Sequence, residues 1–336
     1  PALVRYRAVG LSARGNSIHA ANKVMAKVSR PEVAAQFLAA APERILARLL
    51  ESGAISAEQA DLARQVPMAD ALCVESDSGG HTDMGMPFTL IPAMVRQRDA
   101  AAAAYPRFGR VHVGAGGGIG TPEAAAAVLM LGAEFLLTGS INQCTVEART
   151  SDMVKDMLAA MAVQDTAYAP SGEMFELGSK VQVLKKGLFF PARADKLVSL
   201  YRQYDSLEAI DAESRRQVED RFFRQPLEAV WDDVRRHLPP SEIERAERLP
   251  KHRMALVFKR YFKNASRWAL DGVTERKVDF QIHCGPALGA FNQWVAGSDI
   301  EDWRRRHVDA IALRLLDATA HVLNRRFAAL LPGNAP

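Results

Sequence analysis

The sequence predicts an α/β fold, with a parallel sheet in its first half and a mainly helical second half. Three observations lead to this prediction. Short apolar strands alternate with helical segments over residues 1–150, as in parallel sheets joined by crossover helices. Glycine-rich turns follow successive strands, and from Ser151 the chain becomes charged and mostly helical in its spacing. We therefore divide the chain into residues 1–150 and 151–336. Strand spacing alone suits either a (β/α) barrel or a doubly wound sheet.

Four short apolar strands are expected in the first half, at residues 23–29, 69–75, 110–115 and 134–138. Helical spacing predicts helices at residues 41–65, with a break near Gly53, and at residues 91–105 and 121–131. Thr121 fits the N-cap of the last of these helices, because Pro122 suits the first helical position. The second half is expected to be helical except for a strand at residues 181–184 and a loop at residues 189–193.

The composition excludes several classes of protein. The chain has 336 residues, 48% of them hydrophobic and 24% charged, with a net charge of +4 spread along the sequence. This balance gives no sign of nucleic-acid binding, although it suits an acidic protein partner. The three cysteines are far apart and lack CxxC spacing, which argues against disulfides and a metal site. Because neither a membrane-spanning apolar run nor a signal peptide is found, we expect a cytoplasmic protein without membrane contact.

Two glycine turns on consecutive strands carry the strongest chemical signal. The first contains Gly116, Gly117 and Gly118 and leads into a helix, and the second holds Gly139 and Ser140. Glycine lets backbone amides approach a ligand closely, and a helix N-terminus favours an anion. The dinucleotide pattern GxGxxG is not met in either register. A purely structural turn is the alternative, but paired turns of this kind form phosphate sites in many barrels.

A third glycine turn, SDSGGH, follows the second strand and ends at His81. A histidine at a strand end can donate or accept a proton near neutral pH. A surface or packing role is the alternative for a single loop histidine. Lys27, in the preceding strand, and the two phosphate turns are expected on the same face, which favours a catalytic role for His81.

Several segments together resemble the PfaD family, the trans-acting enoyl reductases of polyunsaturated fatty acid and polyketide synthases. These segments are ESDSGGHTD, VGAGGGIGTPEAAAA and FLLTGSINQCTVEA, in this order. The likeness continues through KVQVLKKGLFFPARADKLVSLY, PKHRMALVFKRYF and DFQIHCGPALGAFNQWV, and so covers nearly the whole chain. The family is related to nitronate monooxygenases (2-nitropropane dioxygenases) and to FabK flavin enoyl reductases. The long helical second half favours the PfaD branch.

The resemblance implies a TIM (β/α)8-type barrel that binds FMN, with NAD(P)H as co-substrate and a 2-enoyl thioester on an acyl carrier protein as substrate. It implies that the turns at Gly116–Gly118 and at Gly139 and Ser140 hold the flavin phosphate. Lys27, Gly79 and Gly80 would lie beside the flavin ring, and amides at the latter two could also serve the enolate oxygen. His81 would be the catalytic acid.

One departure from the family pattern affects the fold. The chain begins where family members are already in mid-barrel, and it offers about four strands where a barrel needs eight. We therefore expect a barrel without its N-terminal strands in this chain, followed by a helical appendage. Other synthase subunits are expected partners, and a homodimer is compatible with the sequence.

Three other functions remain open at this point: nitronate oxidation, a barrel enzyme for a phosphorylated substrate without flavin, and a non-catalytic docking subunit of a synthase. Several polar or reactive residues are given structural roles. Cys144 and Cys284 are expected to be buried, and His112 to belong to the core. His283 could reach the active site, but a packing role is favoured. Residues 304–306, three consecutive arginines, are expected on a solvated face or at a carrier-protein contact.

Overall fold

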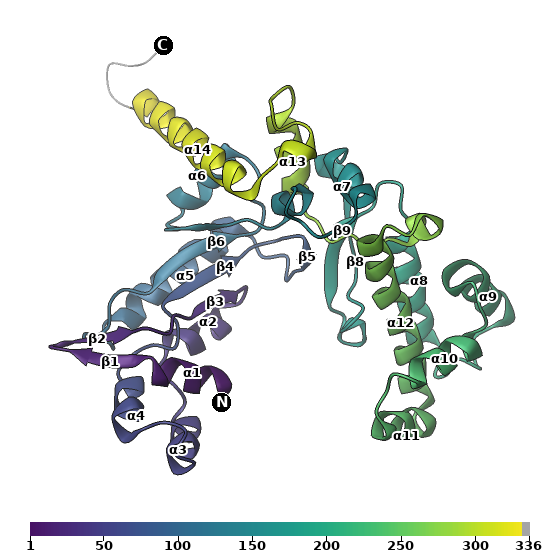
Figure 1. Ribbon diagram of the computed structural model, residues 1–336, viewed down its shortest axis with the longest axis horizontal. Helices are drawn as coiled ribbons and strands as arrows, with labels where there is room; N and C mark the ends of the chain where they lie inside the picture. Colours follow the sequence, from purple (N-terminus) through teal and green to yellow (C-terminus); the bar gives the residue numbers. More distant parts are fainter. Residues whose placement is uncertain (331–336) are drawn as a thin grey trace. The chain divides into compact units, whose positions relative to one another are not determined.

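The structure is a computed structural model that describes residues 1–330 (Figure 1). The chain forms two compact units. Unit 1 contains Pro1–Asp77, Asp83–Gly139 and the segment from Ala312 on, whereas unit 2 contains Ser78–Thr82 and Ser140–Ile311. The chain therefore enters unit 2 twice, once for a short segment that includes His81. The main boundary lies at Gly139, close to the expected residue 150, but the C-terminal helix from Ala312 on belongs to unit 1.

Unit 1 is built on a four-stranded parallel sheet. Its strands, in spatial order, are β3 (Met25–Val28), β4 (Ala71–Glu75), β6 (His112–Gly116) and β7 (Leu136–Leu137). The four predicted strands and their parallel pairing are thus confirmed. Within the described residues the sheet is open, with β3 and β7 at its edges, so this part of the chain does not close a barrel by itself.

The helices of unit 1 follow the predicted pattern with additions. They are α1 (Ala2–Val9), α2 (Pro31–Leu38), α3 (Glu43–Glu51), α4 (Ala57–Arg64), α5 (Pro87–Ala102) and α6 (Pro122–Met130). The break predicted at Gly53 separates α3 from α4. α5 begins earlier than predicted, because Pro87 occupies its first turn after the extended Met86. The structure also contains elements that were not predicted: α1, α2 and an antiparallel hairpin of β1 (Leu11–Arg14) and β2 (Ser17–Ala20).

The helices cover one face of this sheet. α2 packs on β3, and α5 packs on β4 and β6 (Figure 1). Along β3 the side chains of Ala26 and Val28 are buried, whereas Met25 is 54% exposed and the Lys27 side chain is 55% exposed. Because side chains alternate across a strand, Lys27 points to the face opposite these helices.

Unit 2 contains a smaller antiparallel sheet. Its strands, in spatial order, are β5 (Gly80–His81), β9 (Lys180–Leu184) and β8 (Thr166–Pro170). The predicted strand at residues 181–184 is confirmed as β9. β5 and β8 were not predicted: β5 has two residues, and it pairs with β9 across a long sequence separation, Gly80 opposite Gln182 and His81 opposite Val181.

The rest of unit 2 is helical. Its α-helices are α7 (Asp152–Ala159), α8 (Phe190–Gln203), α9 (Ala212–Gln217), α10 (Leu227–Arg235), α11 (Pro240–Arg248), α12 (Pro250–Asp271) and α13 (Pro286–Val295). Shorter helical segments are η1 (Ser140–Cys144), η2 (Val163–Asp165), η3 (Phe175–Leu177), η4 (Val218–Phe223, a π-helix), η5 (Thr274–Asp279) and η6 (Trp303–Arg305). α14 (Val308–Leu330) starts in unit 2 and belongs to unit 1 from Ala312 on. The loop predicted at residues 189–193 is wrong, because α8 begins there at Phe190 with Pro191 in its first turn.

A buried carboxylate organises the helical core of unit 2. Asp279 is fully buried; it accepts a hydrogen bond of 2.8 Å from the Tyr261 hydroxyl and forms an ion pair with Arg193. Arg276 lies 3.6 Å from its other oxygen. Burial, followed by the charge of Asp279, raises the pKa of Tyr261 far above its usual value. Because a buried charge is costly unless it is paired, these partners are needed to keep the carboxylate in this position.

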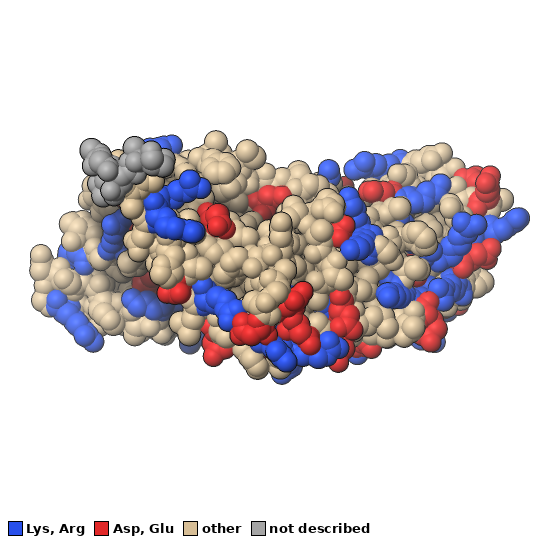
Figure 2. All heavy atoms as spheres, turned by 90° about the horizontal axis from the view of Figure 1, so that it is seen from above, with Lys and Arg blue, Asp and Glu red and all other residues tan. Residues whose placement is uncertain are grey.

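Surface charge is mixed. On the face shown in Figure 2, basic and acidic side chains lie next to one another. No helix within residues 1–330 is long and apolar enough to cross a membrane. The same part of the chain holds no group of three or more His, Cys, Asp or Glu residues that could bind a metal ion.

Candidate functional site

In unit 1, the predicted cofactor residues lie at the carboxyl edge of the parallel sheet. Gly116 ends β6, Gly117 and Gly118 follow it, and Gly139 follows β7. Lys27 lies near the end of β3, and its Nζ forms an ion pair of 2.8 Å with Glu75 Oε1 at the end of β4. The carboxyl edge of a parallel sheet is where ligands bind in α/β proteins.

Gly117 is required by both conformation and space. Its φ is +86°, and a Cβ at this position would stand 2.6 Å from the carbonyl oxygen of Ser76 and 2.7 Å from that of Asp77. Only glycine meets both conditions without strain. The turn after β6 therefore packs backbone to backbone against the turn after β4.

Gly118 and Gly139 differ from Gly117 because they face open space. No heavy atom lies within 4 Å of the position that a Cβ would take at either residue, and Gly118 also has a positive φ of +73°. α6 begins just beyond, with the Thr121 hydroxyl accepting a hydrogen bond from the Ala124 amide and Pro122 in the first turn. This confirms the predicted N-cap. A helix N-terminus beside open glycines suits an anionic group.

In unit 2, Gly79 and Gly80 set the position of His81. A Cβ on Gly79 would stand 2.5 Å from the carbonyl carbon of Cys284, so the two backbones are in close contact. Gly80 has a φ of +85°, and a Cβ there would lie 3.5 Å from His283 Nδ1. Ser140, the remaining predicted residue, accepts a hydrogen bond of 2.9 Å from the Gly285 amide. The segment that carries Cys284 and Gly285 thus contacts two predicted site segments of unit 2.

His81 is exposed, and its ring forms a contact on one side. Its Nε2 lies 2.9 Å from the Ser171 hydroxyl. Its ring meets the ring of His283 edge-on, with the centroids 6.1 Å apart and the planes at 80°. The sequence favoured a packing role for His283, but the structure brings it beside His81. The antiparallel bridge between His283 and Val183 of β9 makes this possible, since β9 also pairs with β5.

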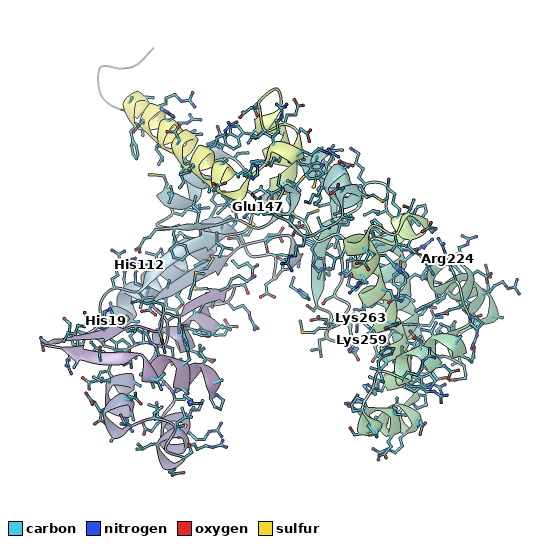
Figure 3. The ribbon with its side chains drawn as sticks, viewed as in Figure 1. His19, His112, Glu147, Arg224, Lys259 and Lys263 are labelled. Carbon is cyan, nitrogen blue, oxygen red and sulfur yellow. The ribbon has the colours of Figure 1, made fainter. Side chains whose placement is uncertain are left out.

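Both histidines line one pocket of unit 2 with a volume of about 480 Å³. Its wall also includes Ser171, Glu173, Gln281, and two lysines one turn apart on α12, Lys259 and Lys263 (Figure 3). Lys259 forms an ion pair with Glu176. Burial, followed by the charge of His81, lowers the pKa of His283. The pocket is large enough for a small ligand and brings together two imidazoles of different environment.

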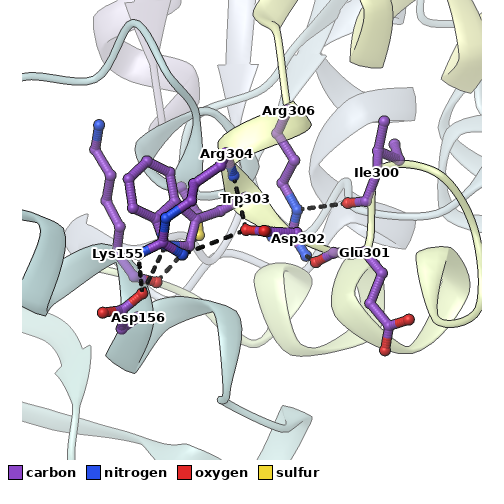
Figure 4. A network of polar contacts seen from close by, with 9 residues as sticks. Lys155, Asp156, Ile300, Glu301, Asp302, Trp303, Arg304 and Arg306 are labelled. Carbon is purple, nitrogen blue, oxygen red and sulfur yellow. Dashed lines mark hydrogen bonds and ion pairs between the residues drawn. The ribbon is translucent and has the colours of Figure 1, made fainter.

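Two structural expectations are wrong. His112 does not belong to the core: its side chain is 60% exposed and its Nδ1 lies 2.6 Å from Glu134 Oε2 at the surface. Arg306 is not on a solvated face, because it is 1% exposed and its guanidinium donates to the carbonyls of Ile300 and Glu301 (Figure 4). Arg304 is exposed and pairs with Asp156, which also accepts from the Trp303 indole (Figure 4).

The cysteines behave as expected. Cys73, Cys144 and Cys284 are all free and buried. Burial raises the pKa of Cys73 and of Cys144 to about 11, and that of Cys284 to about 12. A thiol with so high a pKa is a poor nucleophile at neutral pH.

Comparison with known proteins places this geometry in a family. Polyketide biosynthesis protein PksE of Bacillus subtilis (strain 168) is 56% identical over 327 residues, which are 97% of this chain and 43% of PksE. ThaF of Burkholderia thailandensis, another polyketide biosynthesis protein, is 53% identical over 332 residues, 98% of this chain and 29% of ThaF. The chain thus spans less than half the length of these curated relatives.

A solved structure matches over most of its length. The enoyl reductase domain of MlnA, from the macrolactin biosynthesis cluster of Bacillus amyloliquefaciens, has a TM-score of 0.94 and 44% identity, and the match covers 98% of this chain and 74% of that chain. Residues 204–280 match the model of the inserted helical domain of [acyl-carrier-protein] S-malonyltransferase. The chain belongs to the PfaD-like family of enoyl reductases of polyketide and polyunsaturated fatty acid synthases.

Proposed function

We propose that this chain is part of an FMN-dependent enoyl reductase that uses NAD(P)H to reduce a 2-enoyl thioester carried by an acyl carrier protein. The observation that carries the proposal is the exposed His81 in a pocket with a second histidine, in a chain that also offers an open glycine turn at a sheet edge. The match to the MlnA enoyl reductase domain supports it.

The glycine turns of unit 1 fit the phosphate of FMN. Gly118 and Gly139 leave open space where any other residue would place a Cβ, and the positive end of the α6 helix dipole favours an anion. Lys27, which is partnered by Glu75, would lie near the ring. When bound, FMN would supply the hydride that reduces the substrate double bond.

In this proposal the fold of unit 1 is part of a (β/α)8 barrel. Four parallel strands with helices on one face are the repeating pattern of that barrel, and the exposed Met25 and Lys27 would face its interior. The other strands would come from other parts of the longer proteins that this family contains.

The chain's own residues would position and protonate the substrate. His81 would donate a proton to the α-carbon after hydride has added to the β-carbon, and Ser171 would orient its imidazole. Carrier-protein binding is assigned to the helical part of unit 2, because residues 204–280 match a helical domain of a transferase that acts on acyl carrier protein. The mixed but net basic surface suits an acidic carrier.

The test uses the complete protein. We expect flavin absorbance in the visible spectrum, bleaching of that absorbance by NAD(P)H without oxygen, and its return when a short 2-enoyl thioester is added. Bleaching by a nitronate in place of NAD(P)H, with the absorbance restored by oxygen but not by the thioester, would identify a nitronate monooxygenase. A colourless protein that gains no flavin from added FMN would contradict the proposal.

A further inference from the structure

The side chain of His283 is fixed at its Nε2 atom by a short chain of hydrogen bonds. The Ser266 hydroxyl of α12 donates to Gln281 Oε1 over 3.2 Å. Gln281 Nε2 then lies 2.7 Å from His283 Nε2. An amide nitrogen has protons to donate and no lone pair to accept with, so His283 Nε2 accepts this hydrogen bond.

This arrangement selects one form of the imidazole. A neutral histidine that accepts at Nε2 carries its proton on Nδ1. Burial is the main reason that the pKa of His283 is lowered; the charge of His81 acts in the same direction, and the carboxylate of Glu173 opposes it. At neutral pH the ring is therefore neutral and protonated at Nδ1.

The Nδ1–H group is available to a ligand. Within residues 1–330 it makes no hydrogen bond, and Nδ1 lies on the Gly80 side of the ring, 3.5 Å from the position that a Cβ on Gly80 would take. The ring lines the same pocket as His81. The site thus holds one exposed imidazole, bound to Ser171, and one half-buried imidazole whose free donor is fixed by Gln281.

We propose that His283 is a second catalytic residue, which donates its Nδ1–H to the carbonyl oxygen of the enoyl thioester. The inference rests on the proposed function. As hydride adds to the β-carbon, the electrons of the double bond move onto this oxygen to give an enolate. His81 then protonates the α-carbon and the carbonyl re-forms, while His283 keeps its proton throughout. A fixed neutral donor stabilises such an oxygen without having to reorganise during the reaction.

Two substitutions of His283 distinguish its role as a hydrogen-bond donor from a role in packing. His283→Leu removes the donor, whereas His283→Asn places an amide N–H close to the position of Nδ1. We expect the Leu variant to slow flavin reoxidation by enoyl thioester by roughly 10²–10³-fold, and the Asn variant to recover a large part of that loss. Reduction by NAD(P)H should stay at the wild-type rate in both. His237→Leu, at an exposed histidine of unit 2, is the matched control.

Gln281→Glu tests the direction of the hydrogen bond. The new carboxylate would accept from Nε2–H, which leaves Nδ1 without its proton in the neutral ring. Reoxidation should therefore be slow at pH 8 and should recover as the pH falls and both ring nitrogens become protonated. Gln293→Glu, at an exposed position of α13, should show no such dependence. A Gln281→Glu variant with the wild-type rate and pH profile would contradict the assignment.

A readout independent of turnover is the tautomer itself. Nitrogen-15 spectra of the complete protein should show His283 protonated at Nδ1 and accepting at Nε2, and protonation at Nε2 would overturn the inference. If the wild-type protein reduces enoyl thioesters and His283→Leu does so equally fast, the role of His283 is wrong while the proposed function stands. If the wild-type protein does not reduce them, both are wrong.

Discussion

The two units contrast in how each builds its own group of candidate site residues. Unit 1 presents backbone: glycines at the ends of neighbouring parallel strands, each defined by its own local sequence. Unit 2 presents side chains: His81, Ser171 and His283 come from three segments far apart in the chain and meet through the short antiparallel sheet. A backbone site is therefore visible in a local motif, whereas a side-chain site depends on pairing between distant segments.

The largest expected effect concerns the backbone site. Gly117→Val would place a branched side chain at a φ of +86° and within 2.7 Å of two carbonyl oxygens, so the turn must move. We expect complete loss of bound flavin from the full-length protein and a destabilisation of at least about 2 kcal/mol. Absorbance of the purified protein measures the first effect and chemical denaturation the second.

The control for this substitution is Gly109→Ala, because a Cβ at Gly109 would meet no heavy atom within 4 Å and its φ is not positive. This variant should retain flavin and stability. A Gly117→Val protein that purifies with its full flavin content would show that the turn after β6 does not hold the cofactor.

The next effect tests whether the core of unit 2 is independent of the glycine turns. Tyr261→Phe removes the hydroxyl that donates to the buried Asp279, and should cost roughly 1–2 kcal/mol. Hydrogen exchange should show the loss in α12 and its neighbours and not in β4 or β6. Tyr204→Phe removes a hydroxyl that bonds Asp211 at the surface and should cost less. An equal loss of hydrogen-exchange protection in β6 would show that the core of unit 2 is not independent of the glycine turns of unit 1.

An effect of similar size is expected in acid, from a carboxylate of unit 1. Burial opposes ionisation of Glu134, but hydrogen bonds from Arg98 and His112 and the charge of Arg110 outweigh it and lower the pKa of Glu134 to about 2. A lowered carboxylate pKa stabilises the fold above the unfolded-state value of about 4.3, and that stability is lost as the pH falls toward 2.

Glu134→Gln should therefore flatten the acid side of the stability profile. We expect the wild type to lose about 1–2 kcal/mol more than this variant between pH 5 and pH 2, with the exposed partners limiting the size. Parallel denaturation curves of both proteins at the two pH values measure this difference. Parallel acid profiles would mean that Glu134 is not held by its partners.

The same contrast explains what the sequence could predict. The four parallel strands were found because each is a short apolar run that ends in a turn, and the Thr121 cap was found because a cap is local. β5 was missed because two residues have no periodicity, and β8 because its partner determines it. His283 was read as packing, since nothing in QIHCG indicates that β9 brings it to His81.

The predictions for His112 and Arg306 were wrong because long-range packing reverses the exposure that the local sequence suggests. His112 lies within an apolar strand, yet its side chain points to the surface, where its Nδ1 forms a hydrogen bond with the carboxylate of Glu134. Arg306 follows two exposed arginines, yet its guanidinium is enclosed by backbone carbonyls and by Asn292. In both cases the neighbours in sequence misled, because the direction of a side chain is determined by long-range packing.

The central claim is that His81 protonates the substrate in a flavin enoyl reductase, and stopped-flow measurement of the two half-reactions of His81→Ala tests it most directly. We expect NAD(P)H to reduce the variant's flavin at the wild-type rate, and reoxidation by enoyl thioester to slow by roughly 10²–10⁴-fold. His19→Ala, at an exposed histidine of β2, should match the wild type in both steps (Figure 3). Reoxidation of His81→Ala at the wild-type rate would contradict the account.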